Sequence, residues 1–388
     1  MVQSTKRNLP RRPVDWTREV AQRTSEESSR IDEELILAHQ FEDEGPNQSL
    51  LAIFLDIPEQ SPREYELSIF SRVIGGLVLD RTRDRDFDDP NRLAVWIHDR
   101  SRENKSRPHN GPMKLPELYE ALLKTVTLHL FLRGPISAKT RSGDATISHA
   151  DTRRIYLPNP SRSAFAILAL RASHHQTPAI RQLMLKYITM ETSISIEAPG
   201  AKSDFILHFH MPCLVWRKGP GPRKDSRPTT DGNPIRNTHD LSFLFGAKQE
   251  HDHQTVSDFL YECQTSICLT GSNIHKWTAV ALVDTFFEEE DGNNPNTVPH
   301  YVKEADPEAA EVSGDMDPLS IGMTTADDLW VKDPREYFPL VIRHRAERIK
   351  YEWENASVQL SQRINDHVRE LLSDSFGECL SVPSEEIA

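Results

Sequence analysis

The feature that most constrains this chain is a stripe of apolar residues near its carboxyl end. From residue 333 the sequence reads DPREYFPLVIRHRAERIKYEWENASVQLSQRINDHVRELL. Apolar side chains recur there at steps of three and four, which average about 3.7. Asp333, Pro334 and Glu336 form a helix start: a capping acid, a proline at the first helical position and an acid at the third. The pattern predicts one amphipathic helix over residues 333–373, roughly 50 to 60 Å long at the usual rise per residue.

Two residues interrupt this stripe. Pro339 has no backbone donor, so it should kink the first turns or move the helix start to Phe338. Arg345 places a charge among the apolar positions, and a pure coiled coil would hold a period of 3.5. Two arrangements remain open. The helix lies wholly on its own domain, or its first half packs there while its second half projects toward a protein partner or a second copy.

The rest of the chain mixes two periods. SRSAFAILALRASH and TPAIRQLMLKYITME have helical spacing, with a serine cap and an early proline as start signals. TSISIEA and DFILHFHMPCLVW alternate with a period of two, and PGAK between them predicts a hairpin. We therefore predict an α+β fold: a mixed helix/sheet globular core with a long C-terminal amphipathic helix.

The composition suggests a division of the chain into six parts. Residues 217–234, RKGPGPRKDSRPTTDGNP, form a basic loop rich in proline and glycine that we expect to be mobile. The predicted parts are a flexible tail (1–14), a mostly helical N-terminal part (15–135), an α/β core with the hairpin (136–300), an acidic linker (301–332), the long stalk-like helix (333–373) and a second tail (374–388).

Charge and composition exclude several classes of protein. The formal net charge of −13 disfavours nucleic acid as a partner. The longest apolar runs are far shorter than the roughly 20 residues of a membrane helix, so we expect no membrane span. The first residues, MVQSTKRNLPRRP, do not form a signal peptide. Cys213, Cys263, Cys268 and Cys379 lack the spacing of a zinc site or a disulfide scaffold. These features predict a cytoplasmic protein with reduced thiols.

The best candidate site is a pair of histidines. His208 and His210 share one face of a predicted strand, and His-x-His on a strand is a known metal-ligand geometry. The alternative is that both imidazoles simply line the sheet and bond to their neighbours. Asp284 follows a predicted strand, where a catalytic acid or a plain polar strand end would fit. Further metal ligands could come from His174, His175, His251, Asp252 or His253.

Known catalytic motifs are absent from the sequence. There is no G-x-S-x-G elbow, no phosphate-binding G-x-x-x-x-G-K loop and no G-x-G-x-x-G fingerprint. We therefore predict no cofactor and favour a non-enzymatic protein.

Several segments carry a family resemblance. They include RRIYLPNPSRSAFAILALRASHHQTPAIRQLMLKYITMETSI, LHFHMPCLVWRK, DLSFLF, ECQTSICLTGSNIHKWTAVALVDTFFE and DPLSIGMTTADDLWVKDPREYF. Over residues 150–372 the chain resembles a family of uncharacterised filamentous-fungal proteins labelled CorA-like magnesium transporters, many of which continue into a pair of transmembrane segments. The resemblance implies a cytosolic α/β module with a stalk-like helix.

The chain also departs from that family. No membrane pair follows Leu372, there is no Gly-Met-Asn pore signature, and Gly322 and Met323 are followed by Thr324. The transporter activity is therefore not carried over. We expect an interaction or regulatory module that binds a protein partner, or itself, through the C-terminal helix. The alternatives are a metal-dependent enzyme using His208 and His210, and a sensor of divalent cations related to magnesium transporters.

Overall fold

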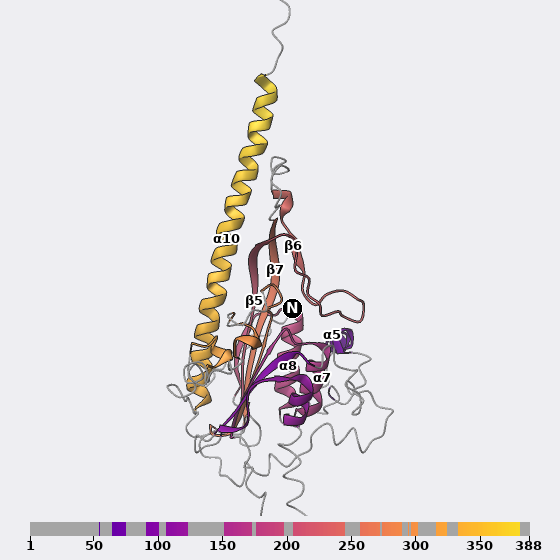
Figure 1. The fold of residues 1–388 in the computed structure, drawn as a ribbon, viewed down its shortest axis with the longest axis vertical. Helices are drawn as coiled ribbons and strands as arrows, with labels where there is room; N and C mark the ends of the chain where they lie inside the picture. Colours follow the sequence, from indigo (N-terminus) through magenta and orange to yellow (C-terminus); the bar gives the residue numbers. More distant parts are fainter. Residues whose placement is uncertain are drawn as a thin grey trace, which may run out of the picture.

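The structure is a computed structural model, and the described part of the chain falls into several segments (Figure 1). They are residue 54, residues 64–74, 91–100, 106–122, 151–172, 176–197, 205–244, 257–271, 274–288, residue 294, and residues 296–301, 316–323 and 333–380. All the structural statements below concern these segments. They confirm the predicted α+β class with a long C-terminal helix.

One eight-stranded sheet organises the fold. Its strand order is β2-β1-β3-β8-β7-β5-β4, with β6 beside the first part of β7. β3 and β8 run parallel, and the other described strand pairs are antiparallel. The strands are β1 (Leu93–Arg100), β2 (Ser106–Lys114), β3 (Thr152–Pro158), β4 (Ser193–Glu197), β5 (Phe205–Gly219), β6 (Thr238–Asp240), β7 (Ser257–Gly271) and β8 (Trp277–Val283).

The predicted boundary at residue 135 does not separate two structural units. β1 and β2 lie inside the part expected to be mostly helical, and β1 pairs with β3 through Ile97 and Ile155. β1, with the sequence LAVWIHDR, is buried on both faces over its last six residues. Such a strand lacks the apolar–polar alternation by which strands are found in sequence. Residues 93–114 therefore belong to the same sheet as the core.

Helices cover one face of this sheet. They are α5 (Glu64–Ile74), α7 (Arg162–Arg171), α8 (Thr177–Thr189) and the helical residues 115–122. Phe70, Phe165 and Leu183 are fully buried in the resulting core, together with Cys268 and Val280 of the central strands. α7 begins where the sequence predicts, because Ser161 accepts a hydrogen bond from the amide of Ala164.

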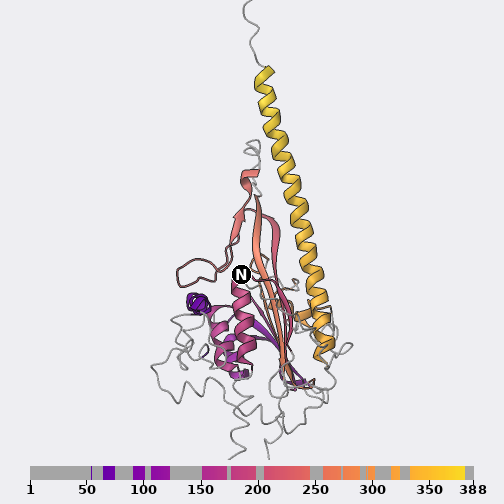
Figure 2. The ribbon, with the colours of Figure 1, turned by 180° about the vertical axis from the view of Figure 1, so that it is seen from behind.

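α10 (Pro334–Leu380) covers the other face and continues past the ends of the strands (Figures 1 and 2). Asp333 caps it as predicted, since its carboxylate accepts from the amide of Arg335 at 2.9 Å. The helix begins at Pro334, not at Phe338, and Pro339 lies exposed inside it. Its 47 residues give a length of about 70 Å.

Arg345 anchors α10 to the turn that precedes it. The guanidinium, 3% exposed, donates to the carbonyls of Leu319 (2.8 Å) and Pro318 (2.5 Å). Tyr337 adds a bond to Asp317 at 2.7 Å. The charge that interrupts the apolar stripe is thus a buried attachment point. Residues 316–323, which were expected to be part of a loose acidic linker, are held between β3 and α10.

Replacing Arg345 with Met should destabilise the fold by about 2–4 kcal/mol, because two buried carbonyls lose their donor. The control is Arg343→Met, since the Arg343 side chain is 72% exposed and forms a surface ion pair with Glu347. That change should stay within about 0.5 kcal/mol. Urea unfolding of the two variants measures the difference, and equal effects would contradict the anchoring role of Arg345.

Candidate functional site

The two histidines predicted as metal ligands lie side by side in the interior. His208 and His210 are fully buried on the face of β5 that α8 covers, and their rings stack at 5.2 Å. His208 lies between Ser195 of β4 and Cys268 of β7, and His210 is next to Ser266. The alternation on β5 is as predicted, because Phe205 and Leu207 face the opposite core.

Burial keeps both imidazoles neutral. Burial and the nearby Lys186 ammonium lower the pKa of His208 to about 3. Burial, the His208 ring and Lys186 lower the pKa of His210 to about 2. The Nδ1 atom of His210 lies 2.9 Å from the Ser266 hydroxyl. The Nε2 atom of His210 and both ring nitrogens of His208 have no hydrogen-bond partner among the described residues.

Neutral imidazole is the form that binds a metal ion. Within the described segments, however, no three His, Cys, Asp or Glu side chains come together in a group that could hold one. The further candidates His174, His175, His251, Asp252 and His253 lie outside the described residues. The structure therefore offers a ligand pair at this position, and the metal site stays a prediction.

The histidine pair should make folding sensitive to acid. Because each folded pKa lies below the ordinary value of 6.5, the unfolded chain binds more protons below pH 6.5. Stability is then fully present above pH 6.5 and falls as the pH drops toward 3. His208→Gln should reduce the loss between pH 7 and pH 5 by about 2 kcal/mol.

Urea unfolding at both pH values measures this change. His239→Gln is the control, because the His239 side chain is 49% exposed. If the two variants show the same pH dependence, the buried histidines do not carry the effect.

Asp284, the other candidate of the sequence, lies at the centre of a buried ion network. Its carboxylate, which is 0% exposed, accepts from Arg236 at 2.6 Å, from Arg227 at 2.7 Å and from the amide of Gln264 at 2.8 Å. Tyr187 of α8 also donates to it. Burial raises the pKa of Asp284, but the two guanidiniums outweigh that effect and hold it below the usual range.

A second carboxylate completes the charge balance of the network. Asp225 binds Arg227 at 2.7 and 2.8 Å, so two carboxylates face two guanidiniums. Arg236 also donates to the carbonyls of Tyr187 and Ile188 at the end of α8. These bonds fix the loop that the sequence predicts to be mobile, and Asp225 and Arg227 are buried within it. Every charge has a partner, which assigns the network a structural role.

Asp284→Asn should destabilise the fold by about 3–5 kcal/mol, because two buried guanidiniums then share one carboxylate. Asp240→Asn is a matched control: Asp240 is exposed, and its bond to the amide of Ser242 can be made by an amide oxygen. That change should stay within about 0.5 kcal/mol. Thermal and urea unfolding compare them, and a mild effect of Asp284→Asn would contradict the network's role.

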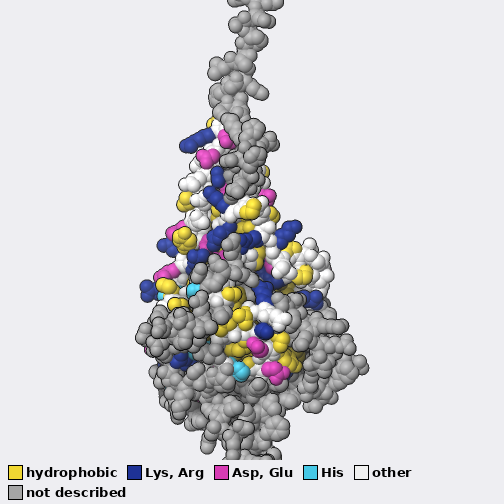
Figure 3. All heavy atoms as spheres, in the orientation of Figure 1, with side chains coloured by type: hydrophobic (Ala, Val, Ile, Leu, Met, Phe, Trp, Pro, Cys, Tyr) yellow, Lys and Arg dark blue, Asp and Glu magenta, His cyan; other side chains and the backbone are white. Residues whose placement is uncertain are grey.

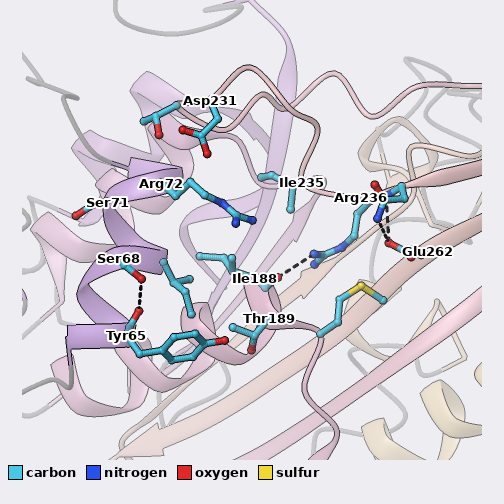
Figure 4. Close-up of a pocket in the computed structure, with 14 residues that line it drawn as sticks. Tyr65, Ser68, Ser71, Arg72, Ile188, Thr189, Asp231, Ile235, Arg236 and Glu262 are labelled. Carbon is cyan, nitrogen blue, oxygen red and sulfur yellow. Dashed lines mark hydrogen bonds between the residues drawn. The ribbon is translucent and has the colours of Figure 1, made fainter.

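A cavity of about 730 Å³ lies in front of this network, between α5, the end of α8, residues 230–237 and Glu262 (Figure 4). Its volume is within the range of about 300–1,000 Å³ of small-molecule sites. Most of its polar groups are already engaged: Arg236 with Asp284, and Glu262 with Asn237. Arg72, which extends into the cavity, and Asp231 make no side-chain hydrogen bond or ion pair with any described residue.

The chemistry of this cavity is limited. Two of the hydroxyls that line it have hydrogen bonds: that of Ser68 donates to the carbonyl of Tyr65, and that of Thr189 lies 3.0 Å from the carbonyl of Leu185 and 3.1 Å from the carboxylate of Glu191. The arrangement offers the guanidinium of Arg72 and the carboxylate of Asp231 to a small polar molecule. Sequence reasoning missed Asp225, Arg227 and Arg236, because a loop rich in Pro, Gly and charge gives no signal that its charges are buried.

The distal part of α10 presents a second type of surface. Its first half is buried at Val341, Ile349 and Ala356, and Glu352 is held by Arg217 at 2.8 and 2.9 Å. Beyond Ala356, Leu360 is half-buried and the other apolar side chains up to residue 372 are exposed. In Figure 3 hydrophobic and charged side chains alternate along the projecting part. We call four exposed apolar side chains of α10 the lateral stripe: Trp353, which precedes Ala356, and Ile364, Val368 and Leu371; they are 41–55% exposed.

Ile364, Val368 and Leu371 of the lateral stripe are exposed, whereas the indole of Trp353 still donates to the carbonyl of Pro212 at 3.4 Å. At 100° per residue, positions 353, 364 and 371 lie within about 20° of one another. They are about 80–100° around the helix from Arg345, which points into the core. Because the apolar spacing slightly exceeds 3.6, the stripe turns gradually from the core toward solvent. This matches the second of the two predicted arrangements, in which the distal half projects.

Comparisons with known proteins identify no relative. No family model, curated protein or solved structure matches the chain. In the described segments no helix combines the length and the apolarity that a membrane crossing requires. The resemblance to CorA-like proteins therefore stays a prediction.

Proposed function

We propose that this protein is a non-enzymatic interaction module that presents the distal half of α10 to another protein chain. The observation that carries the proposal is the change in burial along one helix. Val341 and Ala356 are 0% and 6% exposed, whereas Ile364 and Leu371 are 45% and 55% exposed. If α10 packed only against its own domain, the part beyond the domain surface would not be expected to carry apolar side chains at helical spacing.

The first half of α10 supports this role by fixing the direction of the second. Arg345 and Glu352 tie this half to the domain, and Arg363 adds a 2.7 Å bond to Asp258 of β7 at the start of the second half. Such anchoring limits the entropy that the projecting half would lose on binding.

The energetics fit association with a second copy. Full burial of a large apolar side chain contributes about 1.5–3 kcal/mol. About half of each of the four stripe side chains is still exposed. Covering that half on two helices therefore contributes on the order of 6–12 kcal/mol of binding free energy. The cost of association is roughly 4–15 kcal/mol. These values favour weak, concentration-dependent self-association or a larger interface with a different protein.

A relation to the cytosolic part of CorA-like proteins is consistent with this proposal, because that resemblance implies an α/β module with a stalk-like helix. The cytoplasmic location is proposed on the same ground. The metal-dependent enzyme is less well supported, because its two imidazoles have no third ligand among the described residues. Cation sensing would rest on acidic loops, such as residues 302–315, that lie outside the described segments.

The double substitution Ile364→Ser/Val368→Ser should weaken self-association by at least about tenfold, because it removes two of the four apolar side chains of the lateral stripe. Fold stability should change little, because both residues are largely exposed. Sedimentation equilibrium over micromolar to submillimolar concentrations measures the mass distribution.

The control is Val358→Ser, at a residue 52% exposed and about 120° around the helix from Ile364. It should leave the mass distribution unchanged. A wild-type chain that stays a strict monomer, with the distal half of α10 protected from proteolysis by its own domain, would contradict the proposal.

A further inference from the structure

β4 is the end strand of the sheet, and no described strand pairs with its outer edge. Its sequence, SISIE, contains neither the lysine nor the proline that edge strands commonly carry against unwanted pairing. Ile194 and Ile196 are 59% and 58% exposed, the highest values among the large aliphatic side chains in strands. An edge with two exposed β-branched residues is suited to accept a further strand.

We propose that β4 forms a homodimer by pairing antiparallel with β4 of a second copy. The register centred on Ser195 is the one that pairs all five residues of both strands. It places Ile194 opposite Ile196 of the second copy, and the reverse pair forms by symmetry. Both isoleucines lie on the sheet face covered by α10, since they pair in register with Phe209 and Leu207 of β5. The surface is therefore self-complementary, as a twofold interface requires.

Charge complementarity supports the same register. The Lys186 ammonium of α8 donates to the Ser193 hydroxyl at 2.7 Å and forms no ion pair with a described residue. Glu197 is exposed and likewise has no described partner. The register places Glu197 of the second copy opposite Ser193, with Cα atoms about 4.5–5.5 Å apart. Both side chains lie on the α8 face, so each dimer gains two Lys186–Glu197 pairs.

This pairing would leave α10 free. A twofold axis perpendicular to the sheet puts both copies of α10 on the same side and reverses their directions. Since α10 runs along β5 and extends past one end of the strands (Figures 1 and 2), the two distal halves would project from opposite ends of the dimer. The β4 interface is therefore separate from the lateral stripe, and the two can be tested independently.

A charge exchange tests the pairing in the Ile364→Ser/Val368→Ser background, which removes the contribution of α10. Glu197→Lys and Lys186→Glu should each weaken the dimer by at least about tenfold. Each change places two like charges next to each other in both symmetry-related 186–197 pairs. The double variant Lys186→Glu/Glu197→Lys should restore dimerisation to within about threefold of the starting value. The control is Glu354→Lys on α10, whose side chain is 64% exposed. Sedimentation velocity measures the dissociation constants.

A crosslink tests the register. Ser195→Cys, in a chain that also carries Cys379→Ser, places two thiols across the twofold axis within disulfide range. Mild oxidation should give a covalent dimer on a non-reducing gel. Ser193→Cys should not, because its opposite residue is Glu197 of the second copy.

Three results would overturn the proposal. One is that the Ile364→Ser/Val368→Ser variant stays monomeric at submillimolar concentration. The same holds if this monomer binds an extended peptide of alternating Ile and Ser in place of a second copy. Another is failure of the double charge exchange to restore the dimer. The third is equal crosslinking at positions 193 and 195. None of them bears on the lateral stripe, whose substitutions are tested separately.

Discussion

Burial of the central strands on both faces is the constraint on which this architecture depends. β7 and β8 are apolar on each side, with Cys268 and Val280 facing one core and Ile267 and Ala281 facing the other. A sheet of this kind is stable only when each face is covered. α7 and α8 cover one face and the first half of α10 covers the other. Since α10 is about 70 Å long, covering the sheet leaves its second half for another purpose.

The buried polar groups serve to attach loops and helix ends to this framework. Asp284 connects α8, β7 and the loop around Arg227 and Arg236. Arg345 does the same for α10 and the turn before it. Buried ion pairs of this type contribute little net stability relative to apolar packing, but losing one partner is costly. They therefore determine where segments lie more than how stable the fold is.

The two surfaces that we propose for contacts with other chains differ in kind. The lateral stripe is a helix face that its own domain contacts at Trp353 and leaves exposed at Ile364, Val368 and Leu371. The β4 edge is a row of backbone groups flanked by Ile194 and Ile196. A chain with two independent self-complementary surfaces can form open assemblies as well as closed dimers. The cavity near Arg72 offers charged groups to a small molecule, and its one hydroxyl–carboxylate contact in the described residues joins Thr189 and Glu191.

Local patterns determined much of this protein. The Asp333 cap, the helix after it, the Ser161 cap and the alternation at His208 and His210 all depend on residues close in sequence. The tertiary structure alone decided the rest. The sequence of β1 has no apolar–polar alternation, because this strand is buried on both faces. The hydrogen-bond partners of Arg345 and Asp225 become their neighbours only in the folded chain. Residues 317–320 are buried because α10 packs beside them. Local sequence sets the conformation of a segment, whereas the partner of a buried charge is set by which distant segments the sheet brings together.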